Sequence, residues 1–346
     1  MAANSKIKLA LRLSLITIIC IFLCRFVYQV AVAFSTFSEE KVQVHLYIDK
    51  DDSADSIYTK LSTYSTTQKI ELLKFIGSID DYDKIIKTGH YVIKPEMNVL
   101  DTYKMLRAGQ ETPIKLVVPS VRTMEEMSRR LSKVIMPDSS TLSQCFADTN
   151  ICKDFGKTPQ TISCLFIPNT YEVYWDITPL QLLQRMEKES KKFWNEERRH
   201  AADSLGLSID EIITLASIVD QETAYSKEKP TIAGLYLNRL RKGMLLQADP
   251  TVKYAVGDFS IRRILHKHLT VDSPYNTYLY KGLPPGPIAI PSIQSIDAVL
   301  NAAQHDYIYM CAKEDFSGSH NFAKNLSQHQ RNARKYAAAL NAKKIK

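Results

Sequence analysis

An almost wholly apolar run from about Leu13 to Phe34 constrains this chain most. About 20 consecutive apolar residues are enough to cross the hydrocarbon core of a bilayer as a helix. A cleaved signal peptide is the other interpretation, because Ala31-Val32-Ala33 has the small residues of a cleavage site. Arg25 interrupts the run, but its long side chain could reach the outer interface. We expect a single-pass transmembrane anchor over residues 13–34, and either interpretation exports the rest of the chain.

Positive charge lies on one side of this run only. Lys6, Lys8 and Arg12 precede it, whereas Glu39 and Glu40 follow it. Short flanking segments rich in Lys and Arg stay in the cytoplasm. We therefore expect residues 1–12 to be a cytoplasmic tail, the anchor to lie in the cell (inner) membrane, and the remaining chain to lie outside, on the periplasmic face.

The chain as a whole has the composition of a globular protein. Of its 346 residues, 45% are hydrophobic and 24% are charged, which leaves room for about two or three domains. The net charge is +8, so either the basic surface is simply solvated or an acidic polymer or an anionic membrane lies beside it. No basic-aromatic motif of a nucleic-acid module is present, and we expect no nucleic-acid partner.

The cysteines and histidines do not indicate a metal site. No CxxC or Cys/His spacing typical of zinc is present, and we expect neither a metal nor another cofactor. Of the six cysteines, Cys20 and Cys24 lie in the apolar run. The other four would be exported, where a disulfide such as Cys145 to Cys152 could form, although the spacing leaves the pairing open. GxSxG, P-loop and HExxH motifs are also absent.

Strand and helix patterns alternate after the apolar run, which predicts an α+β fold. Asn98 is an expected helix cap, and Thr123 with Glu126 is an expected capping box. The order of strand, polar turn and helix recurs three times as a weak repeat. The strands are expected at 42–48, 91–94 and 113–118, and the helices at 57–64, 67–76, 98–106 and 123–134.

The second half is predicted to be mainly helical. The charged pattern over 179–204 predicts one long connector helix that faces solvent, and the segment 137–157 has no readable pattern. Ser208 with Glu211 forms a second capping box. Further helices are expected at 230–241, at 249–257, from 292 and at the basic C-terminus, with a strand at 307–311.

The segment Leu215-Ala-Ser-Ile-Val-Asp-Gln-Glu-Thr223 places one carboxylate, Glu222, at the end of an apolar helical face. Glu222 stacks over Ile218 and Leu215, and an apolar setting raises the pKa of a carboxylic acid, which suits a general acid at neutral pH. A solvated glutamate at a helix end is the other interpretation. Asp220 lies about 200° away round the helix, so the two residues cannot be the paired carboxylates of an ordinary glycosidase.

Several polar and aromatic residues downstream of Glu222 could line one groove. Tyrosine faces can pack on sugar rings, but tyrosines are also common in protein cores. Asp249 precedes Pro250, and on spacing alone we expect it to cap a helix. His320 and His329 could be bases, but nothing pairs them with a nucleophile. The other candidates for the groove are Gln247, Thr251, Tyr254, Tyr275, Asn276, Thr277 and Tyr278.

Five segments follow one another in a recognisable order: Leu215–Thr223, Asn238-Arg-Leu240, Gly243–Thr251, Tyr275-Asn-Thr-Tyr278 and Gly282–Ile288. Together they closely resemble the MltG (YceG-like) family, the membrane-anchored endolytic murein transglycosylases. The resemblance is strong over about residues 168–322. It is weaker over 89–105, where the family has a LysM-like subdomain.

The family's catalytic glutamate is the second acid of an S-I-[IV]-E-K-E-T motif, and Glu222 holds that position here. The first acid is Asp220 in this chain, the intervening lysine is Gln221, and Ala248 stands where the family usually has Ser or Thr. These departures leave the expected acid in place. The resemblance implies that substrate is bound by Asn238, Gln247, Asp249, Thr251, Tyr275, Asn276, Thr277 and Tyr278.

The resemblance also implies a domain organisation. A linker over 35–43 would be followed by a LysM-like α+β region over 44–110 and a connecting α+β region over 111–205. A mixed α/β, YceG-like catalytic domain would occupy 206–346.

The implied activity is an internal cut of the MurNAc-GlcNAc β-1,4 bond in nascent peptidoglycan strands, which gives 1,6-anhydro-MurNAc ends and stops elongation. The partners would be the glycan strands, the membrane and the peptidoglycan synthases. A hydrolytic muramidase with Asp249 as its second carboxylate, and a non-catalytic peptidoglycan-binding scaffold, remain as alternatives.

Overall fold

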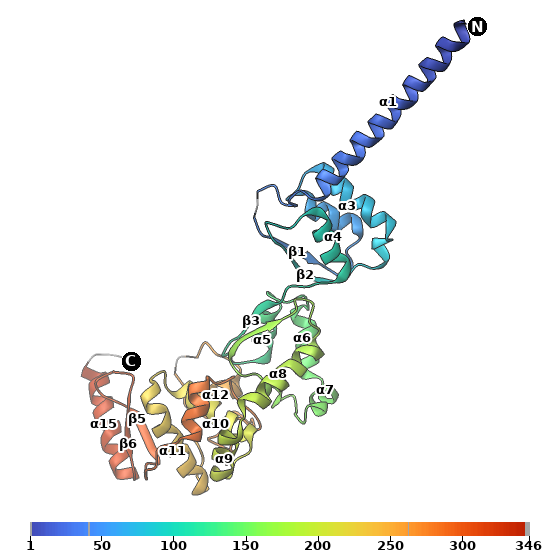
Figure 1. Ribbon diagram of the computed structural model, residues 1–346. Coiled ribbons are helices and arrows are strands. Elements are labelled where there is room, and N and C mark those ends of the chain that lie inside the picture. Colours follow the sequence, from blue (N-terminus) through green and yellow to red (C-terminus); the bar gives the residue numbers. More distant parts are fainter. Residues whose placement is uncertain (1, 41, 262, 343–346) are drawn as a thin grey trace. The chain divides into compact units, whose positions relative to one another are not determined.

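The computed structural model describes residues 2–40, 42–261 and 263–342 (Figure 1). The fold is α+β, as predicted, with an N-terminal apolar helix and small sheets, and the chain divides into two compact units. Residues 1, 41, 262 and 343–346, which belong to the predicted tail, linker and catalytic domain, lie outside the described residues.

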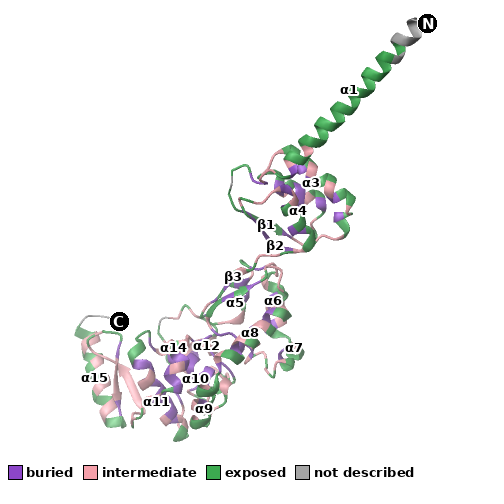
Figure 2. Cartoon of the chain, in the orientation of Figure 1, coloured by how far each residue is buried: buried purple, intermediate pink, exposed green. Residues whose placement is uncertain are grey.

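The apolar run forms one continuous helix, α1 (Ala2–Ala33). Its apolar part, Leu9–Ala33, has 25 residues, or about 37 Å at the rise of an α-helix. Large apolar side chains such as Leu15 and Phe22 are exposed along it (Figure 2). A helix of this length and composition is long enough to cross the hydrocarbon core of a bilayer, which is about 30 Å thick.

The first unit comprises the residues up to Lys115 together with Glu172–Asp176. Strand β1 (Val44–Ile48) pairs antiparallel with β2 (Gly89–Ile93), and the buried and exposed residues of β1 alternate as predicted. The strand begins two residues later than predicted, since Val42 is exposed and outside it. The remaining elements of this unit are α2 (Ala54–Ser62), α3 (Thr67–Ile79), η1 (Tyr82–Lys84) and α4 (Val99–Ala108).

The predicted cap of α4 is confirmed. The Asn98 side chain accepts the backbone N–H of Asp101 at 2.8 Å, and Gly109 ends the helix with a left-handed φ of 67°. The unit has its own core, to which β1, β2, α2, α3 and α4 all contribute side chains. Its LysM-like character stays a prediction.

The strand of the third predicted repeat does not pair with the strands of the first two repeats. Strand β3 (Ile114–Val118) pairs with β4 (Asn169–Val173) in a separate sheet. Thr123 caps α5 (Met124–Leu131) by accepting the N–H of Glu126, but the Glu126 carboxylate binds Arg130. The predicted capping box is therefore only half formed, because an i,i+4 ion pair competes for the glutamate.

The second unit comprises Leu116–Tyr171 and the chain from Ile177 onward. The segment without a readable pattern contains α6 (Ser139–Ala147) and α7 (Thr149–Asp154), followed by η2 (Ile162–Leu165). The prediction of one long helix over 179–204 was wrong, because the segment is broken into α8 (Pro179–Phe193) and α9 (Glu196–Leu205). Trp194 turns into the core, with 2% of its surface exposed, and Asn195 caps α9.

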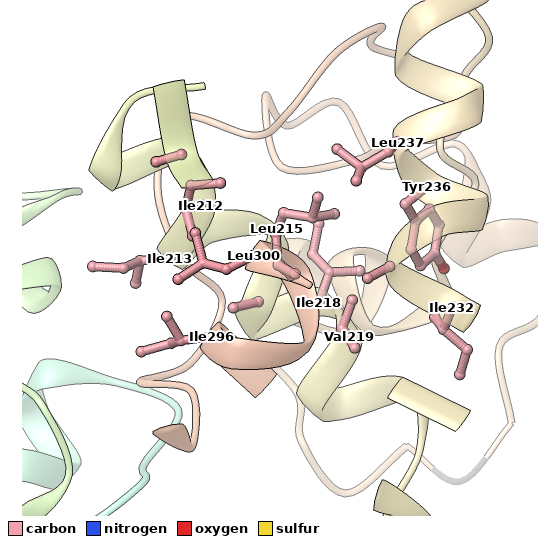
Figure 3. Close-up of a cluster of buried hydrophobic side chains, with 14 of the residues drawn as sticks. Ile212, Ile213, Leu215, Ile218, Val219, Ile232, Tyr236, Leu237, Ile296 and Leu300 are labelled. Carbon is pink, nitrogen blue, oxygen red and sulfur yellow. The ribbon is translucent and has the colours of Figure 1, made fainter. Parts of the chain in front are cut away.

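Three helices form the centre of the second unit: α10 (Ile209–Glu222), α11 (Lys229–Arg241) and α14 (Ile293–Leu300). Figure 3 shows Ile218 and Val219 of α10 beside Tyr236 and Ile232 of α11. The predicted capping box of α10 is confirmed, with Ser208 and Glu211 bonding reciprocally. Because the apolar face of α10 is fully buried, the position of its last residue, Glu222, is tightly fixed.

The second unit also contains η3 (Ser226–Glu228), α12 (Asp249–Val256), α13 (His266–Leu269), the hairpin of β5 (Tyr309–Ala312) and β6 (His320–Ala323), and α15 (Leu326–Ala342). All six cysteines are free, so the Cys145–Cys152 disulfide that was considered is not formed. Cys152 is buried and its thiol instead points to the carbonyl oxygen of Phe146 at 3.4 Å.

Candidate active site

Glu222 is the last residue of α10, at the boundary between the helical core and a cavity. The helix ends here because Thr223 adopts an extended conformation, which its hydroxyl stabilises by accepting the N–H of Tyr225. Ile218 and Leu215 lie beneath the glutamate and have no exposed surface. The carboxylate is therefore held on an apolar base and faces a cavity.

One hydroxyl group fixes the Glu222 carboxylate. Tyr236 of α11, which is buried, donates from its hydroxyl to Oε1 of Glu222 at 2.6 Å. Burial raises the pKa of Glu222 to about 7, although the Tyr236 hydrogen bond lowers it; the Asp249 charge adds to the rise and Arg239 opposes it. A carboxyl group that is about half protonated at neutral pH can give up a proton and then take one back.

Asp220 lies on the other side of α10, as the helical spacing predicted. Its Oδ1 accepts hydrogen bonds from Lys229 at 2.8 Å, from Ser292 at 2.6 Å, and from Ser295. Burial opposes ionisation of Asp220, but these hydrogen bonds and the Lys229 charge outweigh it and lower its pKa. Asp220 thus stays ionised in a structural cluster and does not share the cavity with Glu222.

Glu222 and Asp249 line two cavities together. The larger has a volume of about 910 Å³ and the smaller about 230 Å³. The larger is bounded by α10, α12, the loop that follows α12, and the C-terminal helix α15. Its lining residues include Arg122, Gln221, Lys253, Tyr254, Phe259 and Tyr336. A space of this volume falls in the range of ligand-binding clefts.

Asp249 is not the helix cap that was expected. Ala248 occupies the cap position of α12 and Asp249 is the first helical residue, so its carboxylate is directed to other partners. Tyr278 donates to Asp249 Oδ1 at 2.6 Å, and both residues line the smaller cavity. Burial and this carboxylate raise the pKa of the Tyr278 hydroxyl, which stays protonated as a donor.

Gln247 lines the smaller cavity too, with a left-handed φ of 51°. Its backbone N–H donates to the Thr277 carbonyl at 3.0 Å, and its Oε1 accepts from Arg239 at 3.3 Å. Tyr275 packs on Tyr254, with ring centroids 4.7 Å apart, and lines a different cavity of about 280 Å³.

Four of the predicted substrate-binding residues use their polar groups inside the protein. Thr251 and Thr277 hydrogen-bond to each other at 2.8 Å. The Asn276 amide donates to two carbonyls of the preceding loop, and the Asn238 amide donates to two carbonyls before β5. None of the four lines either cavity beside Glu222. Thr251, Asn276 and Thr277 hold the segments that carry Gln247, Asp249 and Tyr278, whereas Asn238 holds the segment before β5.

The two histidines considered as bases lie in different settings. His320 of β6 lines the smaller cavity, and its Nδ1 lies 3.0 Å from Glu228 Oε2. His329 of α15 stacks on Tyr309, with ring centroids 5.2 Å apart, and burial lowers its pKa. No group of three or more His, Cys, Asp or Glu residues that could hold a metal ion occurs within residues 2–40, 42–261 and 263–342.

The sequence alone did not reveal Tyr236, Arg239 or the contribution of α15. Tyr236 and Arg239 are three residues apart on α11, a spacing that places both on the face turned toward Glu222. Arg239 is buried, and its guanidinium donates hydrogen bonds to the carbonyls of Leu245, Leu246 and Ile308. The spacing of Tyr236 and Arg239 was the local signal available, but the burial of both residues is visible only in the structure.

Curated proteins from two bacteria are similar in sequence to this chain. A protein of Bacillus subtilis (strain 168) named endolytic murein transglycosylase is 34% identical over 204 residues, covering 58% of this chain and 56% of the relative. A Streptococcus pneumoniae (serotype 2, strain D39) protein of the same name is 24% identical over 329 residues, covering 85% of this chain and 58% of the relative. The chain thus spans a little over half the length of these curated relatives.

The fold is also similar to a solved structure. A crystal structure of a YceG-like protein from Listeria monocytogenes is 27% identical and superposes with a TM-score of 0.55, covering 84% of this chain and 98% of that one. A model of the YceG-like family matches residues 46–335, which is most of the chain. This chain therefore belongs to the YceG-like family.

Proposed function

We propose that this protein is a membrane-anchored endolytic lytic transglycosylase that cleaves peptidoglycan glycan strands. The observation that carries the proposal is Glu222: a carboxyl group with a pKa raised to about 7, held by Tyr236 and opening on two adjoining cavities. A strand that is cut internally must continue on both sides of the acid, and a site between two cavities accommodates that. The names of the curated relatives support the same activity.

The proposed reaction needs one acid and no water. Glu222 donates its proton to the glycosidic oxygen between MurNAc and GlcNAc, and the C1–O bond of MurNAc breaks as an oxocarbenium-like centre develops at C1. The C6 hydroxyl oxygen of the same MurNAc then bonds to C1, and its proton returns to the Glu222 carboxylate. The products are a 1,6-anhydro-MurNAc end and a free GlcNAc 4-hydroxyl, and Glu222 is again protonated.

The surrounding residues divide into two proposed roles. Gln247, Asp249 and Tyr278 are placed to contact the sugars beside Glu222, because they line the smaller cavity with it. Tyr275 offers an aromatic face in the adjoining 280 Å³ cavity. The other four would support the site without contacting substrate: Thr251, Asn276 and Thr277 fix the segments that carry Gln247, Asp249 and Tyr278, and Asn238 fixes the segment before β5.

A hydrolytic muramidase is the second candidate, because Asp249 lines the same two cavities as Glu222 and could activate a water. The two reactions differ in the mass of the product. An anhydro end is lighter by one water than the reducing end left by hydrolysis. Mass spectrometry of digested strands therefore separates the two reactions directly.

Glu222→Gln is the decisive variant. The amide keeps the shape and the Tyr236 contact but cannot donate the proton, so we expect strand cleavage to fall by at least about 10²-fold. Binding of uncut strands should persist. Glu197→Gln, an exposed residue in the first turn of α9, is the matched control and should cleave normally. Cleavage at the wild-type rate by Glu222→Gln would refute the catalytic assignment. If the wild type binds strands without cutting them, the protein is a non-catalytic scaffold.

The proposed location follows from α1 and the charges that flank it. With the N-terminus in the cytoplasm and the catalytic unit outside the inner membrane, the site would meet nascent strands as they are made. Its cuts would then end strand elongation, and peptidoglycan synthases would be its partners. The region over 44–110 would act as a LysM-like element.

A further inference from the structure

The larger cavity has a cationic side. Arg122, Lys253 and Arg263 line it together with Glu222 and Asp249. In the part of the chain that the structure describes, no ion pair involves any of these three cations. These three positive charges outnumber the two carboxylates of Glu222 and Asp249 even when both are ionised. A cavity with excess positive charge favours an anionic group on its ligand.

Arg122 is held in place without being neutralised. Its Nε donates to Oε1 of Gln221 at 3.2 Å, and its guanidinium carbon lies 5.3 Å from the ring centroid of Phe259. Both partners are uncharged. Glu126, the acid that shares a neighbouring cavity of about 260 Å³ with Arg122, is bound to Arg130 at 2.6 Å. The positive charge of Arg122 is therefore available to a ligand.

The remaining donors of Arg122 suit a carboxylate. Among the described residues, neither terminal nitrogen of its guanidinium has a hydrogen-bond partner in the protein. A guanidinium presents its N–H groups as a planar fork that matches the two oxygens of a carboxylate. Gln221, which orients Arg122, is also the residue next to Glu222 on α10. The Arg122 guanidinium is thus linked through the Gln221 side chain to the end of α10 that carries Glu222.

Arg122 and Glu222 share the 910 Å³ cavity, and each also lines a smaller cavity that the other does not. Glu222 and Asp249 line both the 910 Å³ and the 230 Å³ cavities. Arg122 and Tyr254 line both the 910 Å³ and the 280 Å³ cavities. A polymer that passes through this series would present one sugar to Glu222 and a different sugar to Arg122.

We propose that Arg122 binds the carboxylate on the side arm of a muramic sugar and so sets the register of the strand over Glu222. This inference rests on the proposed glycan substrate. The strand alternates two sugars and contains two kinds of glycosidic bond, but only every second sugar carries an acidic side arm. A cation that takes this arm at a fixed distance from Glu222 selects one of the two bonds. The carboxylate is either that of the lactyl group itself or one in an attached peptide.

Binding measured with uncut strands tests the proposal. In a Glu222→Gln background, the dissociation constant is measured for peptide-free and for peptide-bearing strands, each with its carboxylates intact or converted to methyl esters. We expect Arg122→Gln to weaken binding of one intact strand type by about tenfold and to leave its ester unchanged. Weaker binding of the peptide-free strand identifies the lactyl carboxylate as the group that Arg122 binds. Weaker binding of the peptide-bearing strand alone identifies a peptide carboxylate.

Two further variants control the experiment. Arg129→Gln removes the same charge from an exposed site on α5 that lines none of these cavities, and should bind every strand as its parent does. Arg122→Lys keeps the charge but loses the fork, and should fall between parent and glutamine variant. Unchanged binding of esterified strands shows that the variant is folded. If Arg122→Gln leaves the ratio of intact to esterified binding at the parent's value, the proposal is overturned.

Cleavage separates this inference from the proposed function. If the wild-type chain binds intact strands more tightly than esters through Arg122 but cuts neither, the transglycosylase assignment fails and the carboxylate site stands. If the wild type cuts, and Arg122→Gln cuts intact and esterified strands in the parent's ratio, the carboxylate site fails and the enzyme assignment stands.

Discussion

In the proposed reaction Glu222 holds a proton before cleavage and regains one afterwards, so its pKa would set the pH range of activity. Burial raises that pKa to about 7 against the hydrogen bond from Tyr236. We expect kcat/KM to fall as the pH rises through about 7, because the protonated fraction of Glu222 falls. Tyr236→Phe removes a donor that favours the charged form, so the pKa rises further and the falling limb should move to higher pH.

The pH–rate profiles of the wild type and Tyr236→Phe measure this shift. Tyr280→Phe is the matched control, since it removes a tyrosine hydroxyl that binds Asp272 on the exposed surface, and its profile should equal that of the wild type. A falling limb at the same pH in Tyr236→Phe would show that the tyrosine does not tune the acid.

The helices α10, α11 and α14 are joined by a buried polar cluster as well as by apolar packing. Lys229 of α11 binds Asp220 of α10 and Ser295 of α14 at 2.8 Å each. Lys229→Met would leave the Asp220 carboxylate buried without its counter-charge, and we expect the free energy of unfolding to fall by about 3 kcal/mol. Adding Asp220→Asn removes the stranded charge and should recover part of that loss.

Urea unfolding at pH 7 measures both variants. The lowered pKa of Asp220 means that its ion pair stabilises the fold above the unfolded pKa of about 4 and that this contribution is lost as the pH falls through the lower folded value. The difference between Lys229→Met and wild type should therefore shrink in acid. An equal midpoint for the two proteins at pH 7 would rule out a stabilising role for the cluster.

Elements with local signals were predictable from the sequence, and elements decided by tertiary contacts were not. Asn98 and the Ser208–Glu211 pair mark helix starts correctly because a cap satisfies backbone groups within three residues of itself. The break at Trp194 was missed because helical charge patterning continues through it. The Asn195 cap was a local signal for the break, but burial of the Trp194 indole in the core is a tertiary contact that the pattern does not show. Pairing of β3 with β4 is likewise a long-range choice.

The candidate site was predictable in the same uneven way. The apolar helix face drew attention to Glu222 but also fitted a solvated glutamate at a helix end, and only the resemblance to the YceG-like family favoured it as the acid. The helical period excluded Asp220 as its partner. Tyr236, Arg122 and the α15 wall come from segments far apart in sequence, and only folding brings them to one cavity. The hydroxyl groups of Thr251 and Thr277 could bind a ligand, but they hydrogen-bond to each other instead. Sequence spacing does not reveal this pairing.

The long helix α1, with its exposed apolar side chains, leads to a prediction about whether the whole chain stays in the membrane. We expect the full chain to stay in the membrane fraction after alkaline extraction, with a mass near 39.4 kDa. A chain that starts at Ser35 keeps the buried Phe37 and should be soluble and folded. Placing lysines at Ile19 and Leu23 is the matched control, because two charges near the centre of the apolar run oppose insertion by about 5 kcal/mol without shortening the chain. A mature protein that lacks the residues up to Ala33 would instead establish the signal-peptide interpretation.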